Sequence, residues 1–169
     1  MANRDQAIGF RPLKILRVTP YDIDATTTMF IDDALNMESD GYPDQAAAAD
    51  TCIIGTSQVY RTSSAAAGII MVCDDPNQEF VAQADGADFT SQTVIGNNCD
   101  ITVGTGSSTT GLSAMEIDSS EVTGAAAQFH LKRRAGDTAI GANAWGANVN
   151  IIGVFYEHMY NSGGGTGYV

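Results

Sequence analysis

The sequence predicts an all-β domain, folded as a jelly-roll-like sandwich or barrel with an extended N-terminal arm. Three observations lead to this prediction. Short runs of β-branched and aromatic residues recur roughly every 10 residues, bounded by Gly, Ser, Asp or Asn. The chain has 18 glycines among its 169 residues, which suits many tight turns. No long stretch carries the apolar period of an amphipathic helix.

The chain divides into three predicted parts. Residues 1–20 are polar, are interrupted by glycine and proline, and are expected to form the arm rather than a packed element. Deletion of the first twelve residues is therefore expected to leave the domain folded. Residues 21–160 form the β-sandwich domain, and residues 161–169 (NSGGGTGYV) form a glycine-rich C-terminal tail.

The individual strands are predicted from runs of strand-forming residues. In chain order they occupy residues 14–18, 26–31, 51–54, 58–61, 68–72, 79–83, 92–95, 100–103, 112–117, 128–132 and 148–156. Phe129 and Leu131 alternate onto one face of their strand. Gly153 marks an expected bulge in the last strand. The segment 32–49 is ambiguous, and a short helix around Ala34 is one interpretation of it.

A strong turn signal separates two of these strands. In Asp74–Asn77 (DDPN) the proline fixes φ, while Asp and Asn side chains hydrogen-bond the local backbone. The strands on either side are therefore expected to pair, so that residues 68–83 form a hairpin.

The net charge of −12 restricts the partners of the chain. Positive charge gathers near the N-terminus and again at Lys132–Arg134. An acidic excess of this size argues against nucleic-acid binding, because phosphate contacts need concentrated cations. No segment approaches the ~20 apolar residues of a membrane span, and the start lacks the apolar stretch of a signal peptide. We therefore expect synthesis in a cytoplasm and no membrane partner.

Candidate catalytic and binding residues are few. Gly104–Gly111 is rich in glycine, but Leu112 stands where a phosphate loop needs lysine, so a plain loop is expected. His130 and His158 belong to no catalytic motif. The carboxylate pairs are expected to be solvated turn residues, with calcium at one of them as the alternative: Asp22 and Asp24, Asp32 and Asp33, and Asp74 and Asp75.

Two further residue types also have structural explanations. Cys52, Cys73 and Cys99 are odd in number and widely spaced, which predicts buried reduced thiols rather than disulfides or a zinc site. Trp145 is expected to anchor the core or an interface, with sugar stacking as the alternative. The sequence thus indicates no enzyme, no cofactor and no metal.

Several motifs, in order along most of the chain, resemble a family of head decoration (cement) and virion structural proteins. These belong to tailed phages that infect cyanobacteria and marine bacteria. Gly9–Pro12 (GFRP) resembles the usual start of that family, and Cys73–Phe80 with Gln83 resembles its DDP segment. The later matches are Gly96–Asn98, Gly104–Gly106, Gly111–Ser113, Met115–Ser120 and the final strand with its closing segment, Val149–Tyr160. The sequence departs from the pattern between residues 26 and 49.

This resemblance implies a β-folded, non-enzymatic homotrimer on the outer surface of a phage capsid. Its partners would be the major capsid protein, near three-fold positions of the lattice, and its own copies. A carbohydrate- or host-surface-binding accessory protein of a phage fibre or tail is the alternative. The basic arm suggests the capsid contacts, for which the candidates are Arg4, Phe10, Arg11, Pro12, Lys14 and Arg17.

Overall fold

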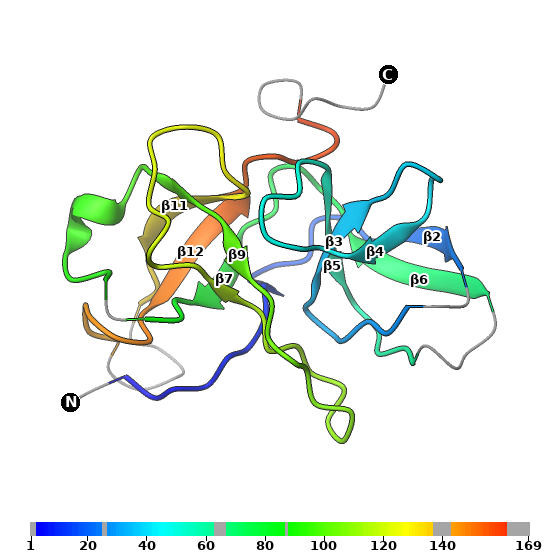
Figure 1. Cartoon of the computed structure of the whole chain (residues 1–169), viewed down its shortest axis with the longest axis horizontal. Coiled ribbons are helices and arrows are strands. Elements are labelled where there is room, and N and C mark those ends of the chain that lie inside the picture. Colours follow the sequence, from blue (N-terminus) through cyan, green and yellow to red (C-terminus); the bar gives the residue numbers. More distant parts are fainter. Residues whose placement is uncertain (1–2, 25–26, 63–66, 87, 137–142, 162–169) are drawn as a thin grey trace.

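The computed structural model describes residues 3–24, 27–62, 67–86, 88–136 and 143–161. Two five-stranded antiparallel sheets pack as a sandwich, so the predicted all-β sandwich is confirmed. Sheet A occupies the left of Figure 1 and sheet B the right. The one helical element of the described residues is the short 3-10 helix η1 (Gln92–Val94).

Sheet A contains the most strongly predicted strands. Its order is β1-β7-β12-β11-β8, with bounds Arg11–Pro12, Phe80–Gln83, Asn150–Phe155, Phe129–Arg134 and Asn98–Cys99. Phe129 and Leu131 are buried on one face of β11, as the alternation predicts. The ladder between β11 and β12 shifts register between Leu131 and Arg133, so the bulge lies in β11 opposite Gly153. A Cβ at Gly153 would collide with the His130 carbonyl oxygen.

Sheet B has the order β2-β6-β5-β3-β4, with bounds Thr19–Ile23, Gly68–Cys73, Ile53–Ser57, Ala34–Met37 and Pro43–Gln45. The helix considered around Ala34 is wrong, because β3 lies between β4 and β5 and pairs with both. A small additional ladder joins β9 (Ile101–Thr102) to β10 (Glu116–Ile117).

The predicted hairpin over residues 68–83 is also wrong. The turn at Pro76 and Asn77 is present, but β6 belongs to sheet B and β7 to sheet A. The turn therefore carries the chain from one sheet to the other. The side chain of Asp74 is held by residues of the N-terminal segment, which anchors the chain at the crossing.

Four phenylalanine rings form a connected group within the core. Phe10, Phe80, Phe129 and Phe155 contact one another, with ring centroids 4.9–5.6 Å apart. All four rings are at most 1% exposed. Edge-to-face and tilted contacts of this kind stabilise a core beyond the area that they bury. A second apolar cluster lies in sheet B, where it includes Ile23, Met29, Leu35, Ile54, Ile70 and Val72.

The predicted N-terminal arm requires correction. Phe10 is fully buried in the core, β1 pairs with β7, and β2 begins at Thr19. The strand expected over residues 14–18 is absent, and this segment is irregular and exposed. The described part of residues 1–20 is therefore packed on the sandwich, because its aromatic side chain completes the core. The predicted tail falls, from residue 162 onward, outside the described residues.

Candidate docking surface

An exposed apolar segment follows β1. Leu13, Ile15 and Leu16 are 48%, 53% and 49% exposed. The segment is fixed in place, because the Leu13 amide donates to the Glu79 carbonyl (3.0 Å) and the Leu16 amide donates to Gln78 Oε1 (3.0 Å). A hollow of about 240 Å³ lies beside it, lined by Leu13, Lys14, Leu16, Asn77, Gln78 and Glu79. Water thus contacts apolar side chains that the fold holds at the surface.

Glu79 connects this segment to a row of cations on β11. Its carboxylate contacts Lys132 Nζ at 2.7 Å and both terminal nitrogens of Arg133, at 2.6 and 2.8 Å. Hydrogen bonds from Arg133 and Lys132 lower the pKa of Glu79 to about 2. Lys132, Arg133 and Arg134 are all exposed, since the bulge after Leu131 interrupts the alternation of β11.

A second hollow is lined in part by these cations. Its volume is about 290 Å³, and it is lined by Gln92, Ile95, Lys132, Arg133, Arg134 and Trp145. The Arg134 guanidinium stacks over the Trp145 ring, 5.3 Å from the centroid. Trp145 is partly buried and packs against the core, so its ring holds Arg134 in a defined position.

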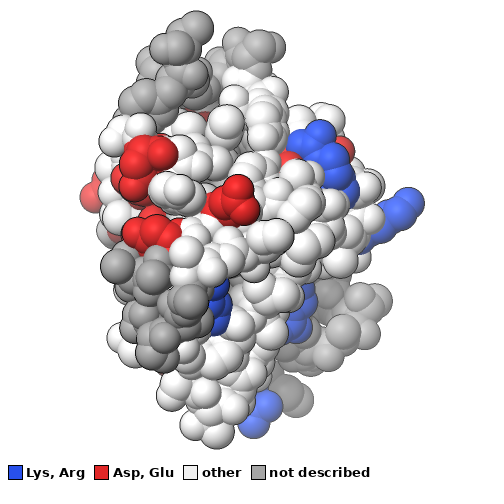
Figure 2. Space-filling model, turned by 90° about the vertical axis from the view of Figure 1, so that its right-hand side faces the viewer, with Lys and Arg blue, Asp and Glu red and all other residues white. Residues whose placement is uncertain are grey.

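We use the name Glu79 surface for eight residues that line one or the other hollow: Leu13, Lys14, Leu16, Glu79, Lys132, Arg133, Arg134 and Trp145. It carries four cations and one carboxylate, whereas the whole chain has a net charge of −12. Figure 2 views the molecule from the sheet B side, where acidic side chains gather at the upper left and basic ones lie mainly to the right and below. The arrangement can bind a partner that is both apolar and acidic.

The predicted contact residues lie in different environments. Lys14 lines the apolar hollow, and Arg4 is exposed. Phe10 has no exposed surface, so its assignment as a contact residue is wrong. Pro12 belongs to β1, opposite Phe80. Arg11 contacts Asp32 at 3.4 Å.

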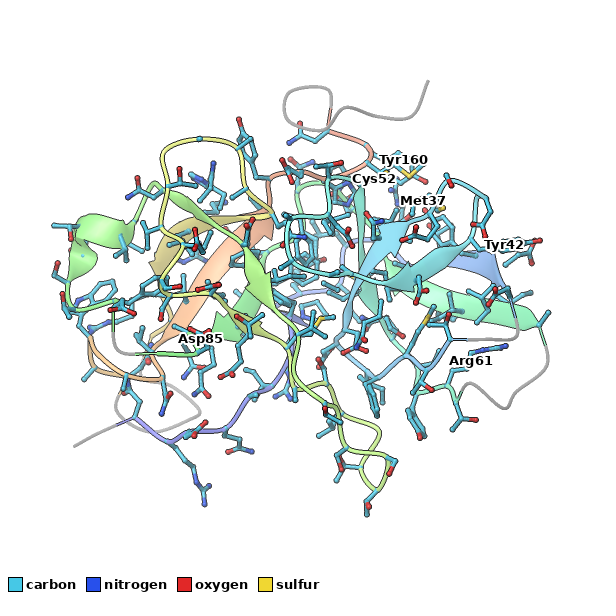
Figure 3. All side chains as sticks on the ribbon, viewed as in Figure 1. Met37, Tyr42, Cys52, Arg61, Asp85 and Tyr160 are labelled. Atoms are coloured by element: carbon cyan, nitrogen blue, oxygen red, sulfur yellow. The ribbon has the colours of Figure 1, made fainter. Side chains whose placement is uncertain are left out.

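Arg17, the last of the predicted contacts, belongs to a buried polar network. Asp74 is 1% exposed and accepts hydrogen bonds from Arg17 Nε (2.7 Å), Thr19 Oγ1 (3.0 Å) and Tyr21 OH (2.8 Å). Tyr21 OH lies 2.7 Å from Tyr160 OH, which Figure 3 places at the upper edge of the sandwich. Burial alone would raise the pKa of Asp74, but these hydrogen bonds and the Arg17 charge hold it below its usual range.

The residues considered for catalysis have structural partners. His130 Nδ1 lies 2.7 Å from Asn98 Oδ1. His158 is 1% exposed, accepts a hydrogen bond from the Tyr160 amide, and has a pKa that burial lowers to about 4. The loop Gly104–Gly111 is closed by an antiparallel bridge between Ser107 and Leu112, and it projects from the lower edge of Figure 1.

The prediction that the paired carboxylates are solvated is wrong for Asp32, Asp33 and Asp74, which are 5%, 0% and 1% exposed. The three thiols are free and buried, which agrees with the sequence prediction. Within the described ranges, no group of three or more His, Cys, Asp or Glu side chains could hold a metal ion.

The sequence predicted only Lys14 of the Glu79 surface as a contact residue. The sequence placed Leu13 in the arm and Leu16 in a predicted strand, and Glu79 and Trp145 lie far from them in sequence. The available signal was the run of three cations at Lys132–Arg134, because in a regular strand Arg133 would lie on the core face with Phe129 and Leu131.

No protein-family model, curated protein or solved structure matches the chain. None of the helical structure in the described residues is long and apolar enough to cross a bilayer.

Proposed function

We propose that the chain is a non-enzymatic decoration protein, which binds the outside of a tailed-phage head as a homotrimer and stabilises the lattice of the major capsid protein. The observation that carries the proposal is the exposed apolar segment Leu13–Leu16, which Glu79 connects to the cations of β11. Apolar side chains held at the surface and rimmed by polar groups are typical of protein interaction sites. The acidic remainder of the chain would face water and repel neighbouring copies.

Two further arguments support a structural role. His130 and Asp74 each take part in hydrogen bonds that link separate segments of the fold, and His158 is 1% exposed. The motifs Gly9–Pro12 and Cys73–Phe80, which resemble the decoration family, lie side by side, since Pro12 is opposite Phe80 in the β1–β7 ladder. A protein that binds only the assembled shell stabilises it by mass action, and several weak contacts per trimer add avidity.

Attachment can be tested with a charge placed in the apolar segment. Leu16→Glu is expected to weaken co-sedimentation with purified heads of the parent phage by on the order of tenfold or more, because a carboxylate would be buried at the contact. The fold should be unaffected, since Leu16 is 49% exposed.

Leu112→Glu is the matched control, because Leu112 is 40% exposed and lies outside the Glu79 surface. It should sediment with heads like the wild-type chain. Wild-type chain that stays in the supernatant at saturating concentrations would contradict the proposed function.

A further inference from the structure

The two hollows of the Glu79 surface differ in chemistry and are connected through the ion pairs of Glu79. The hollow beside Leu13 and Leu16 is apolar, whereas Lys132, Arg133 and Arg134 line the other. Glu79 lines the first and forms ion pairs with two residues of the second. A single extended ligand that passes over Glu79 would contact the apolar hollow and then the cationic hollow.

The cations of this surface are not neutralised by the chain itself. Glu79 is one carboxylate shared between Lys132 and Arg133. In the described part of the chain, Lys14 and Arg134 form no ion pair with a carboxylate, and Arg134 stacks on Trp145 instead. The surface therefore keeps an excess of positive charge for an incoming anion, and the stacked guanidinium is already ordered for bidentate contact with a carboxylate.

We infer that the Glu79 surface binds an extended acidic segment of a partner protein, with a leucine-like side chain over Leu13 and Leu16 and carboxylates over Lys132–Arg134. The inference rests on the proposed function in so far as that partner would belong to the phage head. Charge complementarity supports an acidic partner, and the apolar hollow requires side chains that a pure polyanion lacks.

A long polyanion fits this surface less well. The net charge of −12 repels nucleic acid or a sulfated polysaccharide wherever such a ligand extends beyond the four cations. A short protein segment avoids that repulsion because its charges end where the cations end.

Trp145 provides a direct reporter, because it is the single tryptophan of the chain and lines the cationic hollow. We would titrate the full chain with a synthetic peptide of Leu-Glu-Glu repeats and follow tryptophan fluorescence. A saturable change is expected, and it should weaken as salt screens the ion pairs. A Leu-Gln-Gln peptide of equal length should give no saturable change.

The variant Lys132→Gln with Arg134→Gln should weaken binding of the Leu-Glu-Glu peptide about tenfold or more, whereas Arg4→Glu, an exposed cation that lines neither hollow, should leave it unchanged. Amide chemical shifts would confirm that the peptide contacts residues 13–16. Tighter binding of oligo(dT) or of heparin oligosaccharides than of the peptide would overturn the inference, as would the absence of any peptide binding.

Head sedimentation separates the two hypotheses. If wild-type chain sediments with heads and the double variant sediments equally, the inferred site is wrong and the proposed function stands. If the chain binds the peptide but not heads, the site is supported and the proposed function is wrong.

Discussion

Phe10→Ala is expected to lower the free energy of unfolding by about 3–5 kcal/mol, the usual cost of removing a buried phenylalanine ring. Phe10 is fully buried, and its ring centroid lies 5.0 Å from that of Phe129 and 5.3 Å from that of Phe155. The cavity would open where the N-terminal segment meets sheet A. Urea denaturation followed by circular dichroism measures the loss.

Leu13→Ala is the matched control, because Leu13 lies three residues away and is 48% exposed. Its effect should stay within about 0.5–1 kcal/mol. The sequence predicted that the first twelve residues are dispensable for folding. We now expect their deletion to destabilise the domain, because it would remove both Phe10 and β1. Equal stabilities of Phe10→Ala and Leu13→Ala would show that residues 1–20 are an arm after all.

Asp74→Asn is expected to cost about 2–4 kcal/mol at neutral pH. The substitution preserves shape, but it removes the charge that accepts hydrogen bonds from Arg17, Thr19 and Tyr21. Those contacts join the N-terminal segment to the crossing between the sheets, so their loss weakens the packing of both. Thermal or urea unfolding of the two proteins gives the difference.

The pH dependence of that difference provides an independent test. The folded pKa of Asp74 is below its ordinary value, so its contribution is fully present above the unfolded pKa of about 4 and is lost as the pH falls through the folded pKa. The stability gap between wild type and Asp74→Asn should therefore narrow in acid. Asp75→Asn is the control, because an asparagine at that position can still accept the Asn77 amide hydrogen bond. A gap that stays constant in acid would contradict a charged role for Asp74.

The fold class could be predicted from local pattern, whereas strand pairing could not. Alternation correctly identified Phe129 and Leu131 as core residues, and the apolar run at the end of the chain became β12. The turn at Asp74–Asn77 was recognised from its residues, but a turn signal does not specify which sheet the next strand joins. That choice depends on the contacts of Asp74 with residues more than fifty positions away.

The N-terminal segment was misinterpreted for a related reason. Its mixed composition, interrupted by glycine and proline, is typical of an arm, and one phenylalanine in such a segment does not reveal that two other aromatic rings contact it. The docking surface was equally hidden, since Leu16, Glu79 and Arg134 meet only after folding. The clustering of basic residues was visible in the sequence, but the apolar neighbours of those residues were not.

The most direct test of the central proposal is a cryo-electron microscopy reconstruction of the phage particle that carries this chain, at a resolution that shows side chains. We expect trimers of the β-sandwich on the outside of the head, near three-fold positions of the lattice, with Leu13–Leu16 and Lys132–Arg134 against an acidic part of the shell. Density for the chain on the tail or fibres, or on the head with the Glu79 surface turned toward solvent, would contradict the account.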